Sequence, residues 1–295
     1  MAKCLPLSPS FGSIHFKLNN GIDMPAIGIG TNRVNTFEET YRLVETSLDI
    51  GYRLFDTGSG YGSEAHLGQA LKELLPKHEL YREDVMISTK ISIPNTATTT
   101  STYKEVVNGI KRSLKLLNTD YMDFYMLHIS GEAIANSAKQ RQQRIIAWKA
   151  MEYSCDKGYT DTIGVCDFSS QNISDILYSE DSLVPSVNQV EFNPFCKKTD
   201  LLEFCESKFI RMQAYNSLGG ASSGRYELLQ HPAVAAAARR HNATPAQVLL
   251  LWALQQGVAV IPKAVTPTHI EDNFELDFRL SDADMLTLAN ISTIE

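Results

Sequence analysis

Residues 85–128 contain VMISTK (85–90), then YKEVVNGIKRSLKLL (103–117), then YMDFYMLH (121–128). The first and last of these segments are short apolar runs of the kind that form buried strands. The middle segment has apolar residues at helical spacing and charged residues on its other face. A strand, a helix and a second strand in this order predict two parallel strands joined by a crossover helix.

The same alternation continues through most of the chain. Further strands are expected at AIGIG (26–30), RLFDT (53–57), TIGVC (162–166), SVNQVEF (186–192), RMQAYN (211–216) and VAVIPK (258–263). Further helices are expected at EETYRLVETSLDIG (38–51), EAHLGQALKELL (64–75) and, after a serine cap, SDADMLTLANI (281–291). Near the start, HFKL and IDMPAIG flank Asn19-Asn20-Gly21. They predict a β-hairpin, because Asn-Gly supplies the positive φ angles that such turns need.

No low-complexity linker or composition break divides the series of eight strands. Barrels of alternating strands and helices routinely use a chain of 295 residues as one domain. We therefore expect an α/β fold with an N-terminal β-hairpin: a single (β/α)8 TIM barrel domain over residues 1–295. A doubly wound open sheet is the alternative.

The composition excludes several classes of protein. With 43% hydrophobic and 21% charged residues, the chain has the composition of an ordinary globular protein. Its net charge is −7 and no basic run occurs, so neither nucleic acid nor an anionic membrane surface is an expected partner. No apolar run approaches the roughly eighteen residues of a membrane span.

The first residues, MAKCLPLSPSFGS, lack the charged start and long apolar stretch of a secretion signal. The five cysteines are scattered and include no C-x-x-C pair, so no disulfide framework or zinc ribbon is indicated. The histidines form no H-E-x-x-H or comparable cluster, and a metal site is not expected. We expect a reduced, cytoplasmic protein.

Reactive side chains lie where several predicted strands end, which in a parallel barrel is the edge that carries the active site. Asp56, Lys90 and His128 end three successive strands, and Tyr61 follows the first of them in a glycine-rich turn. A buried Asp and Lys on neighbouring strands predict an ion pair. Beside this lysine, the phenolic proton of Tyr61 is expected to be easier to release than its reference pKa implies. Such a tyrosine is a candidate proton donor to a carbonyl.

These residues also allow a purely structural interpretation. Asp56 and Lys90 would then be a core ion pair, and His128 a core histidine whose ring nitrogens bond to the backbone. The grouping of all four side chains at one barrel edge favours the chemical interpretation.

The segments LNNGIDMPAIGIGT, DTGSGYGSEAHLG, STK and DFYMLH resemble the aldo-keto reductase family, and GYTDTIGVCDFS, VNQVEFNP, AYNSLG, TPAQVLLLWALQQG and VIPKAVTPTHIEDNF extend the resemblance. It covers about residues 16–282. Proteins of this family are (β/α)8 barrels that reduce aldehydes and ketones with a nicotinamide cofactor. The resemblance implies that Tyr61 is the general acid, that Lys90 and Asp56 tune it, and that His128 orients the substrate.

The resemblance also implies a cofactor site. Its expected residues are Thr31, Cys166, Asp167, Gln189, Tyr215, Asn216, Ser217, Leu218, Lys263, Ala264, His269, Asp272 and Asn273. Cys166-Asp167 replaces a Ser-Asn pair that holds the nicotinamide carboxamide, and an Asp cannot donate as an Asn does. Lys263 matches a phosphate-binding lysine and favours NADPH. His269 replaces an arginine that grips the 2′-phosphate, which leaves NADH possible.

On the substrate side, Asn32, Ser92 and Ile129 lie at or near positions where family members often carry aromatic residues. Their replacement predicts a wider or more polar pocket, suited to a bulky or specialised small-molecule carbonyl substrate. The oligomeric state is left open, with a monomer favoured by the resemblance.

Three functions therefore follow from the sequence. The first is an NADPH-dependent oxidoreductase that reduces an aldehyde or ketone to an alcohol. The second is a barrel enzyme repurposed for non-redox chemistry, an isomerase or dehydratase using Tyr61 and His128. The third is a non-catalytic nucleotide-binding scaffold, against which the intact set of four catalytic residues argues.

Overall fold

The computed structural model describes residues 14–93, 98–129, 137–177, 181–220 and 224–292. Its main sheet has eight strands, each parallel to and hydrogen-bonded with the next strand of the chain. They are β3 (Ile29–Gly30), β4 (Leu54–Asp56), β5 (Met86–Ser92), β6 (Met122–His128), β7 (Thr160–Cys166), β8 (Val187–Glu191), β9 (Arg211–Tyr215) and β10 (Ala259–Val260). The predicted strand order and direction are confirmed.

The sheet closes on itself between its first and last strands. Ile27 and Val260 form a parallel bridge, and the amide of Gly30 donates to the carbonyl of Pro262 at 3.1 Å. A Cβ atom on Gly30 would lie 3.2 Å from the carbonyl oxygen of Ile261, so glycine lets the two strands approach closely. This closure confirms the (β/α)8 barrel and excludes the doubly wound open sheet.

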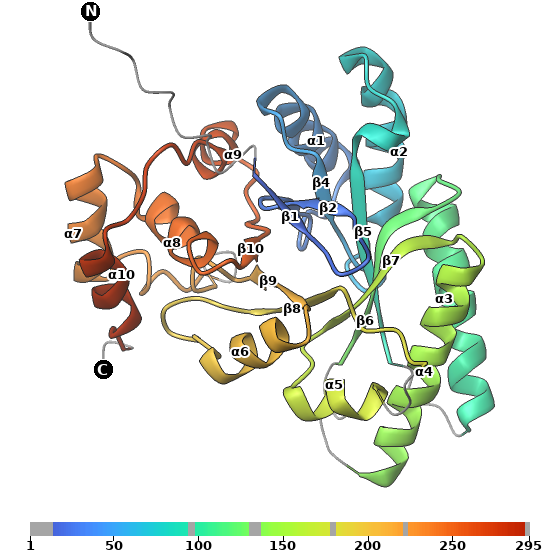
Figure 1. The fold of residues 1–295 in the computed structure, drawn as a ribbon. Helices are drawn as coiled ribbons and strands as arrows, with labels where there is room; N and C mark the ends of the chain where they lie inside the picture. Colours follow the sequence, from blue (N-terminus) through green and yellow to red (C-terminus); the bar gives the residue numbers. More distant parts are fainter. Residues whose placement is uncertain (1–13, 94–97, 130–136, 178–180, 221–223, 293–295) are drawn as a thin grey trace, which may run out of the picture.

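Helices cover the outside of the barrel (Figure 1). They are α1 (Phe37–Ile50), α2 (Glu64–Leu74), α3 (Thr99–Leu117), α4 (Ala138–Asp156), α5 (Ser170–Ile176), α6 (Thr199–Ser207), α7 (Pro232–His241), α8 (Pro245–Leu254), α9 (Pro267–Phe274) and α10 (Asp282–Ala289), with the short 3₁₀ helices η2 (Leu75–His78) and η3 (Arg82–Asp84). The predicted helices are present. Ser281 caps α10 as expected, because its hydroxyl accepts from the amide of Asp284.

The predicted hairpin is formed by β1 (His15–Lys17) and β2 (Asp23–Pro25), with Phe16 opposite Met24. Gly21 in its turn has a φ of +90°, a conformation that glycine adopts without a Cβ clash. Met24 is fully buried against residues that fill the barrel interior: Leu54, Phe124, Met126, Val187, Ala259 and Ile261. The hairpin thus closes one end of the barrel interior. The carboxyl ends of the strands lie at the other end, where a functional site can form.

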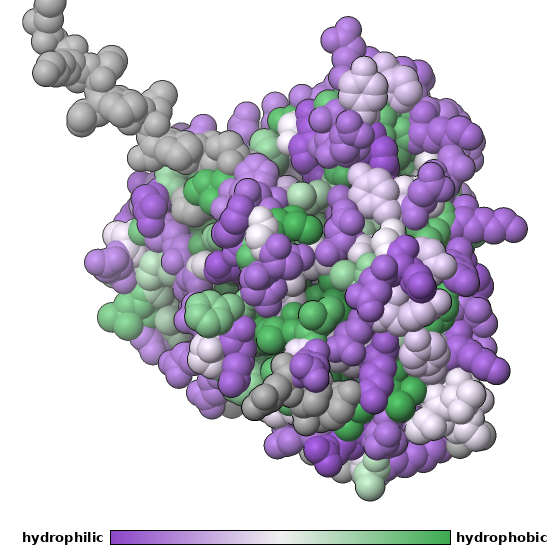
Figure 2. Space-filling view, turned by 45° about the vertical axis from the view of Figure 1, so that its right-hand side comes forward, coloured by the Kyte–Doolittle hydropathy of each residue, from purple (hydrophilic) through white to green (hydrophobic). Residues whose placement is uncertain are grey.

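A larger apolar core lies between the strands and the surrounding helices. Trp148 of α4 and Trp252 of α8 are buried in it. The face shown in Figure 2 is mostly hydrophilic, with hydrophobic residues gathered in small groups. Burial of the apolar side chains of this core, worth roughly 25 cal/mol per Å² of apolar surface, is the main force that stabilises the fold. Within the ranges given above, no helix combines the length and apolar character that a membrane span requires.

The contact between α2 and α3 depends on Gly68. A Cβ atom there would lie 2.5 Å from the backbone carbonyl of Leu117. We expect Gly68→Ala to lower the free energy of unfolding by about 1–3 kcal/mol through overpacking, which outweighs the better helix propensity of alanine. Urea unfolding measures the change. The exposed neighbour Gln69 provides the control, since Gln69→Ala is expected to change stability by less than about 0.5 kcal/mol. Unchanged stability of Gly68→Ala would contradict the account of this contact.

Candidate active site

A buried ion pair joins the ends of two neighbouring strands. Asp56 of β4 and Lys90 of β5 have side chains that are only 3% and 4% exposed. Lys90 Nζ lies 3.0 and 2.8 Å from the two carboxylate oxygens of Asp56, and donates to the carbonyl of Thr57 at 2.8 Å. Oδ1 of Asp56 also accepts from Ser88 Oγ at 2.9 Å and from Gln189 Nε2 at 2.8 Å. The predicted pair is therefore present and supported by further hydrogen bonds.

The ion pair sets the protonation state of the lysine. Burial lowers the pKa of Lys90, but the carboxylate of Asp56 raises it, and the net shift is above the ordinary value. The lysine is therefore an ammonium at neutral pH. Loss of either partner would leave an uncompensated buried charge, which typically costs about 3–5 kcal/mol.

Tyr61 lies beside this pair in the turn that follows β4. Lys90 Nζ is 5.0 Å from the centroid of the tyrosine ring. Between them, a Cβ atom on Gly58 would lie 3.1 Å from Lys90 Cγ and 3.3 Å from Tyr61 Cε1, so glycine permits the close packing. The turn thus holds the phenol against the ion pair.

The sequence predicts that Lys90 lowers the pKa of Tyr61, and the direction of this predicted shift is wrong. Burial raises the pKa of Tyr61 to about 12, although the ammonium of Lys90 lowers it. Desolvation of the phenolate outweighs the attraction of the lysine, a balance that depends on burial and that the sequence does not show. At neutral pH the phenol keeps its proton and is able to donate it.

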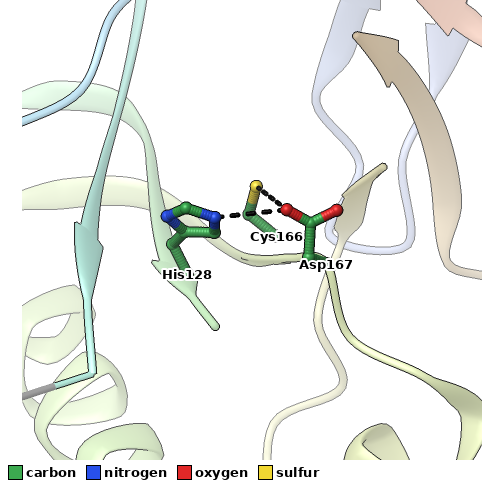
Figure 3. A group of neighbouring side chains, drawn as sticks. All are labelled: His128, Cys166 and Asp167. Carbon is green, nitrogen blue, oxygen red and sulfur yellow. Dashed lines mark hydrogen bonds and ion pairs between the residues drawn. The ribbon is translucent and has the colours of Figure 1, made fainter. Parts of the chain in front are cut away.

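Asp167 contacts three other predicted site residues, and Figure 3 draws two of them, His128 and Cys166. Its Oδ2 lies 3.2 Å from His128 Nε2, and its Oδ1 accepts from the hydroxyl of Tyr215 at 2.8 Å. The thiol of Cys166 points to the same Oδ2, with Sγ at 3.8 Å. Asp167 has a φ of +61°, in the left-handed region that Asp and Asn tolerate better than most residues. The turn after β7 therefore aims a carboxylate at the histidine of β6.

Cys166 is buried, and burial together with the carboxylate of Asp167 raises the pKa of its thiol well above the ordinary value. Its Sγ also lies 3.8 Å from Gln189 Oε1. A protonated, buried thiol is a poor nucleophile.

Two adjoining cavities lie at this edge of the barrel. The first measures about 380 Å³ and the second about 440 Å³, and both are lined by Leu218 and Lys263. Predicted residues that line the first cavity are Asn32, Asp56, Tyr61, His128, Cys166, Asp167, Gln189, Tyr215, Asn216, Ser217, Leu218 and Lys263. Predicted residues that line the second are Leu218, Lys263, Ala264, His269, Asp272 and Asn273. Segments far apart in the sequence thus meet at one edge.

The remaining predicted residues lie beside or away from the cavities. Lys90 lies behind the first cavity, paired with Asp56. Thr31 is buried, and its hydroxyl donates to the carbonyl of Asp56 at 3.0 Å. Ser92 is an exposed residue at the end of β5, and Ile129 is 1% exposed and belongs to the outer apolar core. Of the three predicted substrate residues, only Asn32 is placed at the cavity by the described part of the chain.

The structure adds features that sequence reasoning missed. Arg33, next to Asn32, lines the first cavity and has a φ of +63°. His128, Cys166 and Asp167 also form a group whose potential metal-ligand atoms all lie within 4.8 Å of one another. No sequence spacing marks this group, because its residues come from two strands and a turn. The sequence predicts no metal site, because its histidines form no metal-binding motif.

Comparison with known proteins finds a matching family model and relatives that span most of the chain. The model described as the Aldo/keto reductase family matches residues 26–293. Glycerol 2-dehydrogenase (NADP(+)) of Saccharomyces cerevisiae is 32% identical over 295 residues, covering 93% of this chain and 89% of its own. Morphine 6-dehydrogenase of Pseudomonas putida is 32% identical over 285 residues, covering 94% and 90%. The structure of the aldose reductase from Schistosoma japonicum matches with a TM-score of 0.81 and 32% identity, covering 95% and 93%.

The pKa of Tyr61 is directly testable. We expect its phenol to remain protonated at pH 10, where a free tyrosine is half ionised, because burial disfavours the phenolate. The phenolate absorbance of wild-type protein and Tyr61→Phe, compared from pH 8 to pH 11, isolates this residue from the other tyrosines. A titration that is present in wild type, absent from Tyr61→Phe and centred below pH 10 would contradict the structure. It would show that Lys90 lowers the pKa of Tyr61, as the sequence predicts.

Proposed function

Because the chain belongs to the aldo/keto reductase family and is an NAD(P)H-dependent oxidoreductase, we propose that it reduces an aldehyde or ketone to an alcohol with NADPH. The observation that carries this proposal is the meeting of a protonated phenol, Tyr61, with His128 at one cavity, backed by the buried pair of Asp56 and Lys90. When bound, the reduced nicotinamide supplies a hydride to the carbonyl carbon of the substrate.

Tyr61 supplies the proton in the proposed reaction. As the carbonyl carbon gains a hydride, negative charge develops on the oxygen, and the phenol donates its proton to that oxygen. The phenolate that forms lies beside the ammonium of Lys90, with Nζ 5.0 Å from the ring. The lysine thus stabilises the charged product state, while burial keeps the resting phenol protonated.

His128 positions the substrate in this scheme. It ends β6 and lines the same cavity as Tyr61. A ring N–H that donates to the carbonyl oxygen would hold that oxygen near the phenol. In the structure Nε2 of the ring faces Asp167 Oδ2 at 3.2 Å, so the carboxylate fixes the orientation of the ring.

The side chains around the two cavities fit a dinucleotide. Lys263 lines both cavities, so one cation lies where the two cavities meet. Arg33, Asn216 and Ser217 add charged and polar groups to the wall of the first cavity. We assign this junction to the phosphates and the second cavity to the adenosine.

The carboxamide end also has matching groups. Asp167 presents carboxylate oxygens at the first cavity, which accept from the amide N–H₂ of a nicotinamide, and Gln189 lines the same cavity. The ring of Tyr215 forms part of the wall and offers a stacking surface. With Asp167 in place of an asparagine, the nicotinamide carboxamide donates a hydrogen bond where it would otherwise accept one, and the hydrogen bond itself is kept.

The preference for NADPH depends on Lys263 and His269. The lysine supplies a charge for a phosphate, and the histidine lines the second cavity where a 2′-phosphate would lie. A histidine is a weaker phosphate partner than an arginine, so we propose NADPH first and NADH as a tolerated substitute.

The substrate is proposed to be a bulky or specialised carbonyl compound. Asn32 and Arg33 line the first cavity, so part of its wall is polar and charged. The two enzymes compared above are named for alcohols of very different size, glycerol and morphine, at the same 32% identity. Overall similarity therefore does not select the substrate, and the residues that line the cavity must do so.

The proposed roles are tested by Tyr61→Phe. We expect this variant to bind NADPH as wild type does, because only a hydroxyl is removed. We expect its rate of carbonyl reduction to fall by about 10²- to 10⁴-fold, the usual contribution of a positioned general acid. Binding is measured by quenching of the intrinsic fluorescence of Trp148 and Trp252, and turnover by loss of NADPH absorbance with a panel of aldehydes and ketones.

Wild-type protein titrated with NADPH and with NADH is the control, and NADPH is expected to bind more tightly. Failure of both cofactors to bind would contradict the assigned cofactor site. Unchanged turnover in Tyr61→Phe would instead contradict the role of the phenol alone.

A further inference from the structure

We propose that His128, Cys166 and Asp167 bind a single divalent ion of the zinc class through Nε2, Sγ and Oδ2. Such an ion would keep its remaining coordination position open to the first cavity, which all three residues line. The metal site depends only on these side chains. Its consequence for catalysis, competition with the nicotinamide, rests on the proposed function.

The separations of the three ligand atoms suit a small ion. Nε2 of His128 and Oδ2 of Asp167 are 3.2 Å apart, and Sγ of Cys166 is 3.8 Å from the same oxygen. One ligand atom from each residue, a ring nitrogen of His128, Sγ of Cys166 and a carboxylate oxygen of Asp167, lies within 4.8 Å of the other two. Tetrahedral zinc, with bonds of about 2.0–2.3 Å, separates its ligand atoms by roughly 3.3–3.6 Å. Figure 3 shows the ring of His128 and the sulfur of Cys166 both directed at one carboxylate oxygen of Asp167.

A neighbouring residue orients one of the ligands. The hydroxyl of Tyr215 donates to Oδ1 of Asp167 at 2.8 Å, which leaves Oδ2 directed toward Cys166 and His128. Outer contacts of this kind fix the geometry of metal ligands in proteins.

The charges and the ligand types select the class of ion. On binding, the thiol of Cys166 would release its proton to solvent, and the thiolate with the carboxylate of Asp167 would balance a charge of +2. The nearby cation Lys90 is already paired with Asp56 at 2.8 Å and adds little repulsion. One sulfur, one imidazole nitrogen and one carboxylate oxygen favour zinc-like ions over magnesium or calcium, which prefer oxygen ligands.

An ion here would occupy groups that the nicotinamide needs. Asp167 is the proposed acceptor for the carboxamide, and His128 the proposed partner of the substrate oxygen. Metal and cofactor would therefore exclude each other, and zinc would act as a reversible inhibitor that competes with NADPH.

Cobalt(II) titration of the cofactor-free protein tests the site without relying on catalysis. We expect one cobalt per chain, a thiolate-to-cobalt charge-transfer band in the near ultraviolet, and displacement of the band by zinc. Cys166→Ser should abolish the band, and Asp167→Asn should weaken cobalt binding by at least about 10-fold. Circular dichroism checks that both variants are folded.

Cys155→Ser is the matched control. Cys155 is a half-buried free cysteine on α4, it is not among the residues that line either cavity, and its replacement should leave the band unchanged. A band that is absent from wild type, or that persists in Cys166→Ser, would overturn the metal site.

A second measurement separates the metal site from the proposed function. Zinc should raise the apparent Kd for NADPH in wild type and leave it unchanged in Cys166→Ser. If NADPH fails to bind any variant while the cobalt band appears, the metal site stands and the cofactor assignment fails. If zinc binds and the Kd for NADPH does not move, the competition is wrong.

Discussion

The buried pair of Asp56 and Lys90 is the interaction on which the site depends. Two charges taken out of water are tolerated only when each is compensated, and here the carboxylate of Asp56 meets Lys90 and Ser88 of β5 and Gln189 of β8. The pair can form because the barrel is closed and its strands end at one edge. It supplies the cation beside Tyr61 and fixes the amide of Gln189 at the cavity.

Much of this arrangement was predictable from the sequence. Asp56 and His128 end their strands and Lys90 lies two residues before the end of β5, so parallel strands bring these side chains to one edge and strand positions alone place them. The residues next to Tyr61 in the sequence do not show how deeply its side chain is buried. For that reason the predicted direction of its pKa shift was wrong. The bond between His128 and Asp167 was also missed, because it depends on a backbone turn with positive φ.

Other differences have the same origin. Ser92 and Ile129 come shortly after Lys90 and His128 in sequence, yet Ser92 is exposed and Ile129 packs in the outer core. Ile129 directly follows His128, so its side chain points to the opposite face, whereas Ser92 shares the face of Lys90 but lies at the exposed end of β5. Arg33 lines the cavity because its loop backbone has a positive φ, which no sequence motif predicts. Loops around the barrel edge were therefore the least predictable part of the site.

Asp167 gives the site its particular character. Its two oxygens serve Tyr215 on one side and His128 with Cys166 on the other. A carboxylate at this position accepts from a nicotinamide carboxamide in the proposed reductase, and joins a sulfur and an imidazole in the proposed metal site. The same side chain is thus used in both proposals, so the metal ion and the cofactor cannot be bound at the same time.

The central claim is hydride transfer from a nicotinamide to a carbonyl carbon at this cavity. NADPH deuterated at both C4 positions, incubated with wild-type protein and a panel of aldehydes and ketones, tests it most directly by mass spectrometry of the products. The account predicts an alcohol that carries one deuterium on its carbinol carbon. Products without deuterium, or an absence of reduction across the panel although NADPH binds, would contradict it.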